Sequence, residues 1–110
     1  MQLRMTASAL TLLCSWVLWE KWILHNPGES TQRLVEAVSE SKTLEECRGA
    51  TPDFTKQRAT RLRNAYKEAD YTVNQGEFGV ILFDKRRKST SLEYVYYCLP
   101  STVDPYHDPR

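Results

Sequence analysis

Three cysteines carry the most varied chemistry available to this 110-residue chain. Cys14, Cys47 and Cys98 lie far apart, so the short spacings of zinc sites and of redox Cys-x-x-Cys motifs are absent. The sequence therefore predicts neither a metal site nor a cofactor. In a reducing compartment we expect all three to be buried thiols, whereas in an oxidising compartment they are candidates for a disulfide.

Acid–base catalysis has one candidate pair of adjacent residues, His107 and Asp108. These residues lie in a terminal segment that contains Pro105 and Pro109, without the rigid placement that general acid–base catalysis requires. The other histidine, His25, lies in a turn sequence. We find no phosphate-binding glycine loop and no nucleophile–base set, and we predict that the protein is not an enzyme.

Positive charge is concentrated in two places. Five basic residues and no acid occur from Lys56 to Lys67, and residues 85–88 are all basic. Such clusters bind phosphate groups of anionic lipid surfaces or nucleic acid; the candidate anion contacts are Lys56, Arg63, Lys67, Arg86 and Arg87. The alternative is a solvated helix face and a soluble loop. Because the net charge is only +1, we expect no specific nucleic-acid binding.

Aromatic side chains are concentrated near residues 16–22 and 94–97. Alternate residues of a strand point to opposite faces of a sheet. We therefore expect most of these rings in the core, while one sheet face presents the others to a protein partner. The candidates for this aromatic partner face are Trp16, Trp19, Trp22, Tyr94 and Tyr96.

The first half of the chain begins with an uncharged run over residues 5–19 that resembles a signal peptide but lacks a small-residue cleavage site. A membrane span of about 20 residues would have to include Glu20 and Lys21, at a cost of a few kcal/mol each. We prefer a buried strand over residues 13–24. After the turn residues 25–30, the segment 33–40 fits either a short helix or a strand.

A helix start follows at Thr43, because Thr43 can cap and Glu46 completes a capping box. Residues 49–53 contain a second start signal, so we expect the helix to be interrupted or kinked near Gly49. It continues to Ala69, and one face is predicted to be buried, with Phe54, Leu62, Ala65, Tyr66 and Ala69 on it.

The second half of the chain predicts a turn at residues 74–76 and two strands, over residues 78–83 and 92–99. Together the two strands are expected to form a hairpin with a polar connection. Pro100 stops the last strand, and residues 101–110 lack a core pattern.

Two end motifs stand out, CSWVLW from Cys14 and YCLPSTVDP from Tyr97, with Glu46-Cys47 at the expected helix start between them. On these residues the chain resembles a family of small secreted or periplasmic bacterial proteins of unassigned activity, over residues 14–105. The resemblance implies a leader, two strands, a helix and a final strand that leads into the Cys-Leu-Pro motif. It favours a strand over residues 33–39. The chain departs from the family in its leader, which lacks the cleavage site, and in its tail after Pro100.

A disulfide follows from the resemblance if the protein is exported. In the ββαββ order the first strand and the helix begin at the same sheet edge, so Cys14 and Cys47 are the expected pair. Closing this loop would stabilise the fold by about 3 to 4 kcal/mol on the chain-entropy model. The same counting places Cys98 at the opposite edge, where it stays a thiol or pairs with another chain.

These elements predict an α+β domain in which one helical region packs on a small, mainly antiparallel, ββαββ-like sheet. Residues 1–12 are a leader or loose arm, 13–100 the domain and 101–110 an extended tail. We expect a non-enzymatic accessory or binding domain, periplasmic, secreted or envelope-associated, with an unidentified protein partner. Two alternatives stay open: a membrane-tethered subunit anchored by residues 5–24, and a binder of phosphate-rich surfaces through the basic helix stripe. Ligand and oligomeric state are not predicted, and a cytoplasmic location also stays open.

Overall fold

The computed structural model describes residues 15–105, in which one helix packs against a five-stranded sheet. In these residues the elements follow the order β1 (Trp16–Asn26), β2 (Glu29–Ser41), α2 (Leu44–Ala65), β3 (Tyr71–Gln75), β4 (Gly79–Asp84) and β5 (Ser91–Pro100). The predicted leader or arm over residues 1–12, together with Cys14, lies outside the described residues, as do His107 and Asp108.

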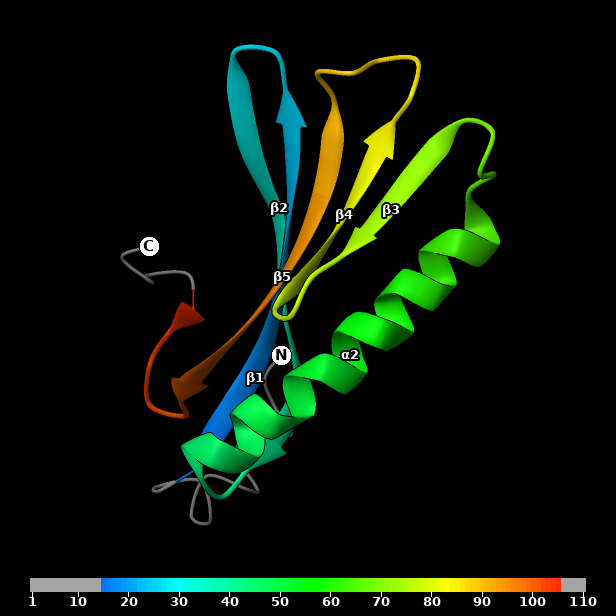
Figure 1. Cartoon of the computed structure of the whole chain (residues 1–110). Coiled ribbons are helices and arrows are strands. Elements are labelled where there is room, and N and C mark those ends of the chain that lie inside the picture. Colours follow the sequence, from blue (N-terminus) through cyan, green and yellow to red (C-terminus); the bar gives the residue numbers. More distant parts are fainter. Residues whose placement is uncertain (1–14, 106–110) are drawn as a thin grey trace.

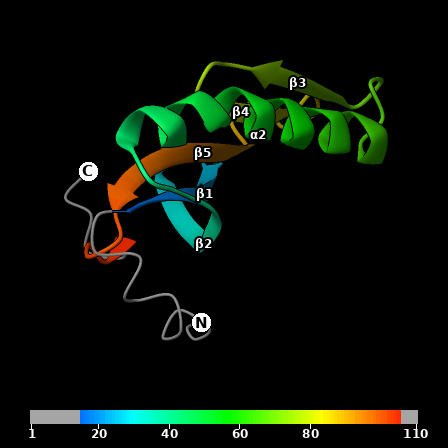
Figure 2. The same cartoon turned by 90° about the horizontal axis from the view of Figure 1, so that it is seen from below.

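The strands form one antiparallel sheet in the order β2-β1-β5-β4-β3, and α2 runs across one of its faces (Figure 1). Figure 2, seen from below, shows the helix and the sheet as two layers. The predicted α+β class, with a mainly antiparallel sheet and one packed helix, is confirmed. The ββαββ order is wrong by one strand, because β3 precedes the predicted hairpin.

β1 and β2 form a hairpin because a strand-forming aromatic run is followed by a turn sequence. Gly28 has a positive φ of 84°, which glycine adopts without a steric cost, and it follows Pro27 in the turn. The strand predicted over residues 13–24 is confirmed for residues 16–24. The segment 33–40 is part of a strand and not a helix, because it pairs with β1.

β5 lies between β1 and β4 and pairs antiparallel with both. The contact with β4 requires a glycine at position 79, because a Cβ there would lie 2.6 Å from the carbonyl oxygen of Tyr94. The hairpin predicted from residues 78–83 and 92–99 is confirmed. Its second strand is central in the sheet. The sequence counting placed the end of this strand, with Cys98, opposite the helix start because it lacked β3, which reverses the direction of the last strand.

α2 begins where the sequence predicts, with the Thr43 hydroxyl accepting a hydrogen bond from the Glu46 backbone N–H at 3.0 Å. The predicted interruption near Gly49 is wrong, because α2 is one continuous helix with Pro52 inside it. Proline removes a hydrogen bond to the carbonyl of Arg48. Arg48 is exposed, so water can satisfy that carbonyl.

The C-terminal end of α2 differs from the prediction, because the helix ends at Ala65 and not at Ala69. Tyr66 is extended, and its N–H caps the Leu62 carbonyl at 2.9 Å. The chain then turns at Lys67 and enters β3. β3 was not predicted, since its sequence YTVNQ is mostly polar and ends in residues typical of turns.

The core lies between α2 and the sheet. The buried residues of α2 form a stripe at nearly every fourth position: Cys47, Thr51, Thr55, Ala59 and Leu62. They face a sheet layer that includes Leu18, Val80, Leu82, Tyr94 and Tyr96. Of the face predicted to be buried, Leu62 is buried and Phe54 partly so. Ala65, Tyr66 and Ala69 are exposed, because they lie beyond or at the end of the packed helix.

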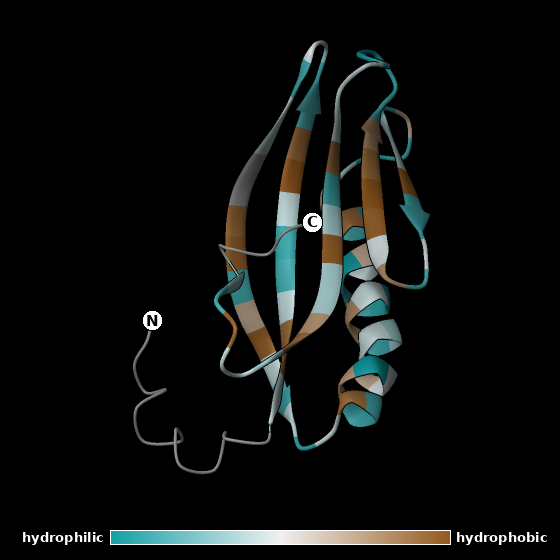
Figure 3. Ribbon diagram, turned by 90° about the vertical axis from the view of Figure 1, so that its left-hand side faces the viewer, coloured by the Kyte–Doolittle hydropathy of each residue, from teal (hydrophilic) through white to brown (hydrophobic). Residues whose placement is uncertain are grey.

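Figure 3 views the far face of the sheet, turned away from α2. Most strands carry both hydrophobic and hydrophilic residues, while β4 is hydrophobic over most of its length. Val17 and Tyr97 are buried on this face. Residues 101–105 turn back beside it: the Ser101 N–H donates to the Ser15 carbonyl at 3.0 Å, and Pro105 is buried. This part of the predicted tail therefore packs against the domain.

Candidate functional site

The disulfide joins Cys47 to Cys98, with a Cα–Cα distance of 6.2 Å. The predicted Cys14–Cys47 pair is wrong, because β5 lies beside β1 and brings Cys98 under the first turns of α2. Cys47 is fully buried. The bond thus ties the start of the helix to the end of the central strand, inside the core. Among the described residues no cluster of three His, Cys, Asp or Glu side chains could hold a metal ion.

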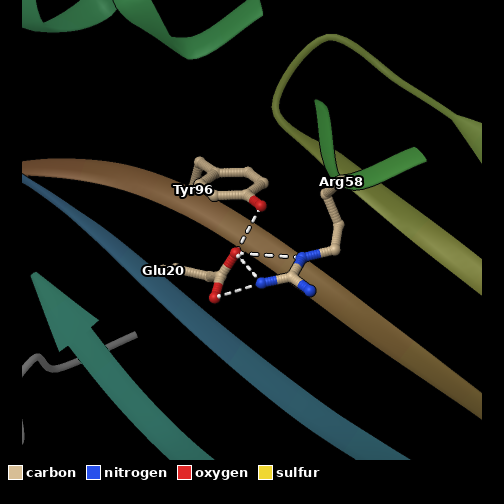
Figure 4. A network of polar contacts seen from close by, with 3 residues as sticks. All are labelled: Glu20, Arg58 and Tyr96. Carbon is tan, nitrogen blue, oxygen red and sulfur yellow. Dashed lines mark hydrogen bonds and ion pairs between the residues drawn. The ribbon is translucent and has the colours of Figure 1, made fainter. Parts of the chain in front are cut away.

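A buried carboxylate lies in the middle of the interface between helix and sheet. Glu20 on β1 is only 4% exposed. Its oxygens accept hydrogen bonds from Arg58 Nη2 at 3.0 Å and from Arg58 Nε at 3.2 Å. Tyr96 on β5 donates its hydroxyl to Glu20 Oε2 at 2.5 Å (Figure 4). We call Glu20, Arg58 and Tyr96 the buried network.

The network changes the acid–base properties of its members. Burial by itself lowers the pKa of Arg58, but the hydrogen bonds to Tyr96 and Glu20 and the carboxylate charge outweigh it, so the pKa is raised. Burial, followed by the hydrogen bond to Glu20, raises the pKa of Tyr96 far above its usual range. Burial likewise raises the pKa of Tyr94. The centroid of its ring lies 4.4 Å from the Arg58 guanidinium carbon.

A small pocket of about 140 Å³ lies beside the buried network, and Glu36, Gln57 and Arg61 form its polar rim. At about 30 Å³ per water molecule, this volume holds only a few waters and is below the usual size of a ligand site. Both oxygens of Glu20 are occupied by Arg58 or Tyr96. The network therefore fastens α2 to the sheet.

The network was missed at the sequence level. Glu20 was read as an interruption of an apolar run, and Arg58 as one of several helix cations. The available signal was one acidic residue, Glu20, between Trp19 and Trp22 in a strand-forming run. A buried acid needs a cation, but only the packed structure selects Arg58 from the five cations of residues 56–67.

The predicted aromatic partner face is not one surface. Trp16, Trp22, Tyr94 and Tyr96 all lie on the side of the sheet that packs against α2. The Trp22 and Tyr94 rings are stacked with 6.2 Å between their centroids. Trp19 lies on the opposite face, because it is an odd number of residues away from both Trp16 and Trp22 and alternate residues of a strand point to opposite faces. The helix thus covers most of the rings that were predicted to be available to a partner.

The predicted anion contacts divide into two groups. Lys56 is exposed near the middle of α2. Arg63 and Lys67 are exposed at its C-terminal end and beyond, where the loop between β4 and β5 approaches. We call this region the basic end; it comprises Arg63, Lys67, Lys85, Arg86, Arg87 and Lys88.

Hydrogen bonds hold the loop of the basic end against the segment that follows α2. The Lys85 N–H donates to the Asp70 carbonyl at 2.9 Å, and its ammonium donates to the Glu68 carbonyl at 2.6 Å. Arg86 pairs with the Asp70 carboxylate at 3.0 Å, which raises the pKa of Arg86. Asp84 accepts from the backbone N–H groups of the loop. Two basic segments remote in sequence are thereby joined.

A depression of about 310 Å³ lies at the basic end. Arg63 and Lys85 line it together with Glu68, and the rings of Tyr66 and Tyr71 contribute an aromatic wall. These two rings meet edge to face, with 4.9 Å between centroids. No pattern in the sequence indicates this pocket, because the helix phase predicts Tyr66 in the core and β3 is not predicted.

Within residues 15–105, no helix is long and apolar enough to cross a bilayer. No family model matches the chain, and neither a curated protein nor a solved structure shows significant similarity to it. The resemblance read from the CSWVLW and YCLPSTVDP motifs therefore stays a hypothesis.

Proposed function

We propose that this protein is a non-enzymatic binding domain of an oxidising, extracytoplasmic compartment, and that its basic end contacts an anionic phospholipid surface. The observation that carries the proposal is the joining of two basic segments at one end of the molecule. The basic end has six cations, and the carboxylates beside them are Glu68, Asp70 and Asp84. The whole chain carries only +1, so the field is local and orients the molecule.

The exposed cations are available for such a contact. Among residues 15–105 no carboxylate lies within ion-pair distance of Arg63, Lys67, Arg87 or Lys88. Each Lys or Arg near an anionic leaflet contributes about 1 kcal/mol to binding. Four such residues therefore suffice for a reversible contact that salt weakens.

The compartment is supported by the disulfide between Cys98 and the fully buried Cys47, because structural disulfides persist in oxidising surroundings. A role without catalysis is supported by the buried network, whose carboxylate has both oxygens occupied. The membrane-tethered alternative, with an anchor over residues 5–24, would require residues 16–24 to leave β1. It predicts attachment that is insensitive to salt.

The test is sedimentation of the full chain with vesicles. We expect binding to vesicles that contain phosphatidylglycerol, little binding to pure phosphatidylcholine, and release at high salt. Replacing Arg87 and Lys88 by Gln should weaken binding about thirtyfold, the equivalent of about 2 kcal/mol. The matched control is Arg48→Gln with Lys56→Gln, two exposed cations of α2 outside the basic end.

Each result has a distinct meaning. Equal losses for the two double variants would show that the contact is the whole helix stripe and not the basic end. Salt-resistant binding to neutral vesicles would favour the anchor over residues 5–24. Absence of binding to both kinds of vesicle would contradict the proposal.

A further inference from the structure

The pocket at the basic end combines features that a charged surface alone does not need. Its volume of about 310 Å³ is at the lower limit of small-molecule sites, so it fits a head group and not a whole lipid. One wall is aromatic, from Tyr66 and Tyr71, and Val73 adds an apolar side chain. The polar rim has two cations, Arg63 and Lys85.

The positions of the two cations suit a phosphate. Arg63 comes from the last turn of α2, while Lys85 comes from the loop after β4, so the two approach the pocket from different elements. Lys85 is held by the hydrogen bond from its ammonium to the Glu68 carbonyl, and two donors of the ammonium are left for a ligand. A guanidinium and an ammonium together bind a phosphodiester by charge-assisted hydrogen bonds.

The carboxylate of Glu68 at the same rim limits what the ligand can be. Beside two cations it repels a compact dianion, such as inorganic phosphate, and it accepts hydrogen bonds from a donor. A ligand that satisfies all three groups has a phosphodiester and, near it, a hydroxyl or ammonium donor. The aromatic wall requires an apolar part on the other side of the phosphate.

We propose that this pocket binds the head group of a single phospholipid, with the phosphodiester on Arg63 and Lys85, the head-group donor on Glu68, and the glycerol and first acyl carbons against Tyr66 and Tyr71. This inference rests on the proposed membrane contact and specifies its ligand. It requires head groups with donors, as in phosphatidylglycerol and phosphatidylethanolamine. The trimethylammonium of phosphatidylcholine has no donor and binds more weakly.

Two other pockets among residues 15–105 do not meet these requirements. The one beside the buried network holds only a few waters. A depression of about 410 Å³ near Phe78, Ile81 and Val95 is apolar, and its charged residue, Glu93, is paired with His25 at 2.9 Å. Neither combines two free donors with an aromatic wall.

The experiment titrates the full chain with dihexanoyl phospholipids below their micelle concentration, followed by NMR of Tyr66, Thr72 and Lys85. Phosphatidylglycerol and phosphatidylethanolamine should shift these signals, and phosphatidylcholine should bind at least about fivefold more weakly. Glycerophosphoglycerol, which has no chains, separates a lipid from a free phosphodiester. If it binds as tightly as the lipid, the aromatic wall has no role and the lipid assignment is wrong.

Variants separate this inference from the proposed function. Arg63→Gln should weaken binding of the soluble lipid at least about tenfold. Glu68→Met, which removes the side-chain acceptor, should remove the preference over phosphatidylcholine. The control Lys67→Gln changes a cation of the basic end that does not line the pocket, so it should weaken vesicle binding alone.

The failures are also distinct. Vesicle binding without any shift by soluble lipids would overturn the head-group site and leave the proposed function standing. Binding of soluble lipids without vesicle binding would overturn the proposed function and leave the head-group site standing.

Discussion

Arg58 and Arg63 lie five residues apart on the same helix, yet the structure gives them opposite surroundings. The side chain of Arg58 is 24% exposed and binds a buried carboxylate. Arg63 is exposed and has no carboxylate within ion-pair distance among residues 15–105. Residue type alone does not distinguish a structural cation from one available to a ligand. The distinction comes from the side chains that the sheet places opposite each position of the helix.

The largest expected difference between the two regions concerns these arginines. Arg58→Met leaves the Glu20 carboxylate buried without its cation, so the free energy of unfolding should fall by about 3 to 5 kcal/mol in urea denaturation. Arg63→Met should change it by less than about 0.5 kcal/mol. The double variant Glu20→Leu with Arg58→Met should recover most of the loss, since no buried charge is left. Equal effects for the two single variants would contradict the comparison.

The disulfide provides a second test of the difference between the two regions. It links the elements that hold the buried network, and it lies away from the basic end. Reduction should lower the free energy of unfolding by about 4 kcal/mol on the chain-entropy model, since Cys47 and Cys98 are 51 residues apart. Vesicle binding by the folded reduced protein should be unchanged.

Mass spectrometry after alkylation of protein from an oxidising host checks the pairing directly. It should show one labelled cysteine, Cys14, and a peptide that links Cys47 to Cys98. A Cys14–Cys47 peptide would restore the pairing that sequence counting predicts.

Tyr96 tests the network by pH. Its pKa is raised in the folded state, so above pH 10 the unfolded tyrosine loses its proton while the folded one keeps it. The stabilisation is therefore complete below pH 10 and is lost as the pH rises further. Tyr96→Phe should reduce this alkaline loss, and at neutral pH it should cost about 1.5 to 3 kcal/mol for the bond to a charged group.

Absorbance of the phenolate provides the measurement for this pH dependence. Tyr94 and Tyr96 should ionise above the usual pH range of tyrosine, because burial raises the pKa of both. If Tyr96→Phe leaves the last-ionising part of the titration curve unchanged, the hydroxyl is not held by Glu20.

The smallest expected effect is at the exposed end of the molecule. Lys67→Ala should change the free energy of unfolding by less than about 0.5 kcal/mol, whereas Leu62→Ala, at a position that is 4% exposed, should cost about 2 to 5 kcal/mol. Thermal denaturation of both variants makes the comparison. A large loss for Lys67→Ala would mean that the basic end has a structural role.

Local signals were sufficient for much of the fold. The Thr43 cap and Glu46 predict the helix start, because a cap satisfies backbone groups within a few residues of itself. The strand-forming runs at residues 78–83 and 92–99 predict the second hairpin for a similar reason: their turn and composition are contained in one short stretch. The helix phase also predicts that Arg63 is exposed.

Local signals failed for elements whose structure depends on contacts with the other layer. β3 is a short edge strand whose residues Tyr71 and Val73 alone are partly buried, so its sequence reads as polar. The continuation of α2 through Pro52 depends on packing of Thr51 and Thr55, both buried against the sheet. Propensity is a weak prior when tertiary contacts oppose it.

The sequence by itself determined the class of the fold, the start of the helix, the turn at Gly28 and the exposure of the basic residues, because each depends on neighbours in the chain. Only the tertiary structure decided that Cys47 pairs with Cys98 and that Glu20 meets Arg58 and Tyr96. Both outcomes follow from the insertion of β5 beside β1. The order of strands in a sheet is set by the burial of whole faces, and no short segment encodes it.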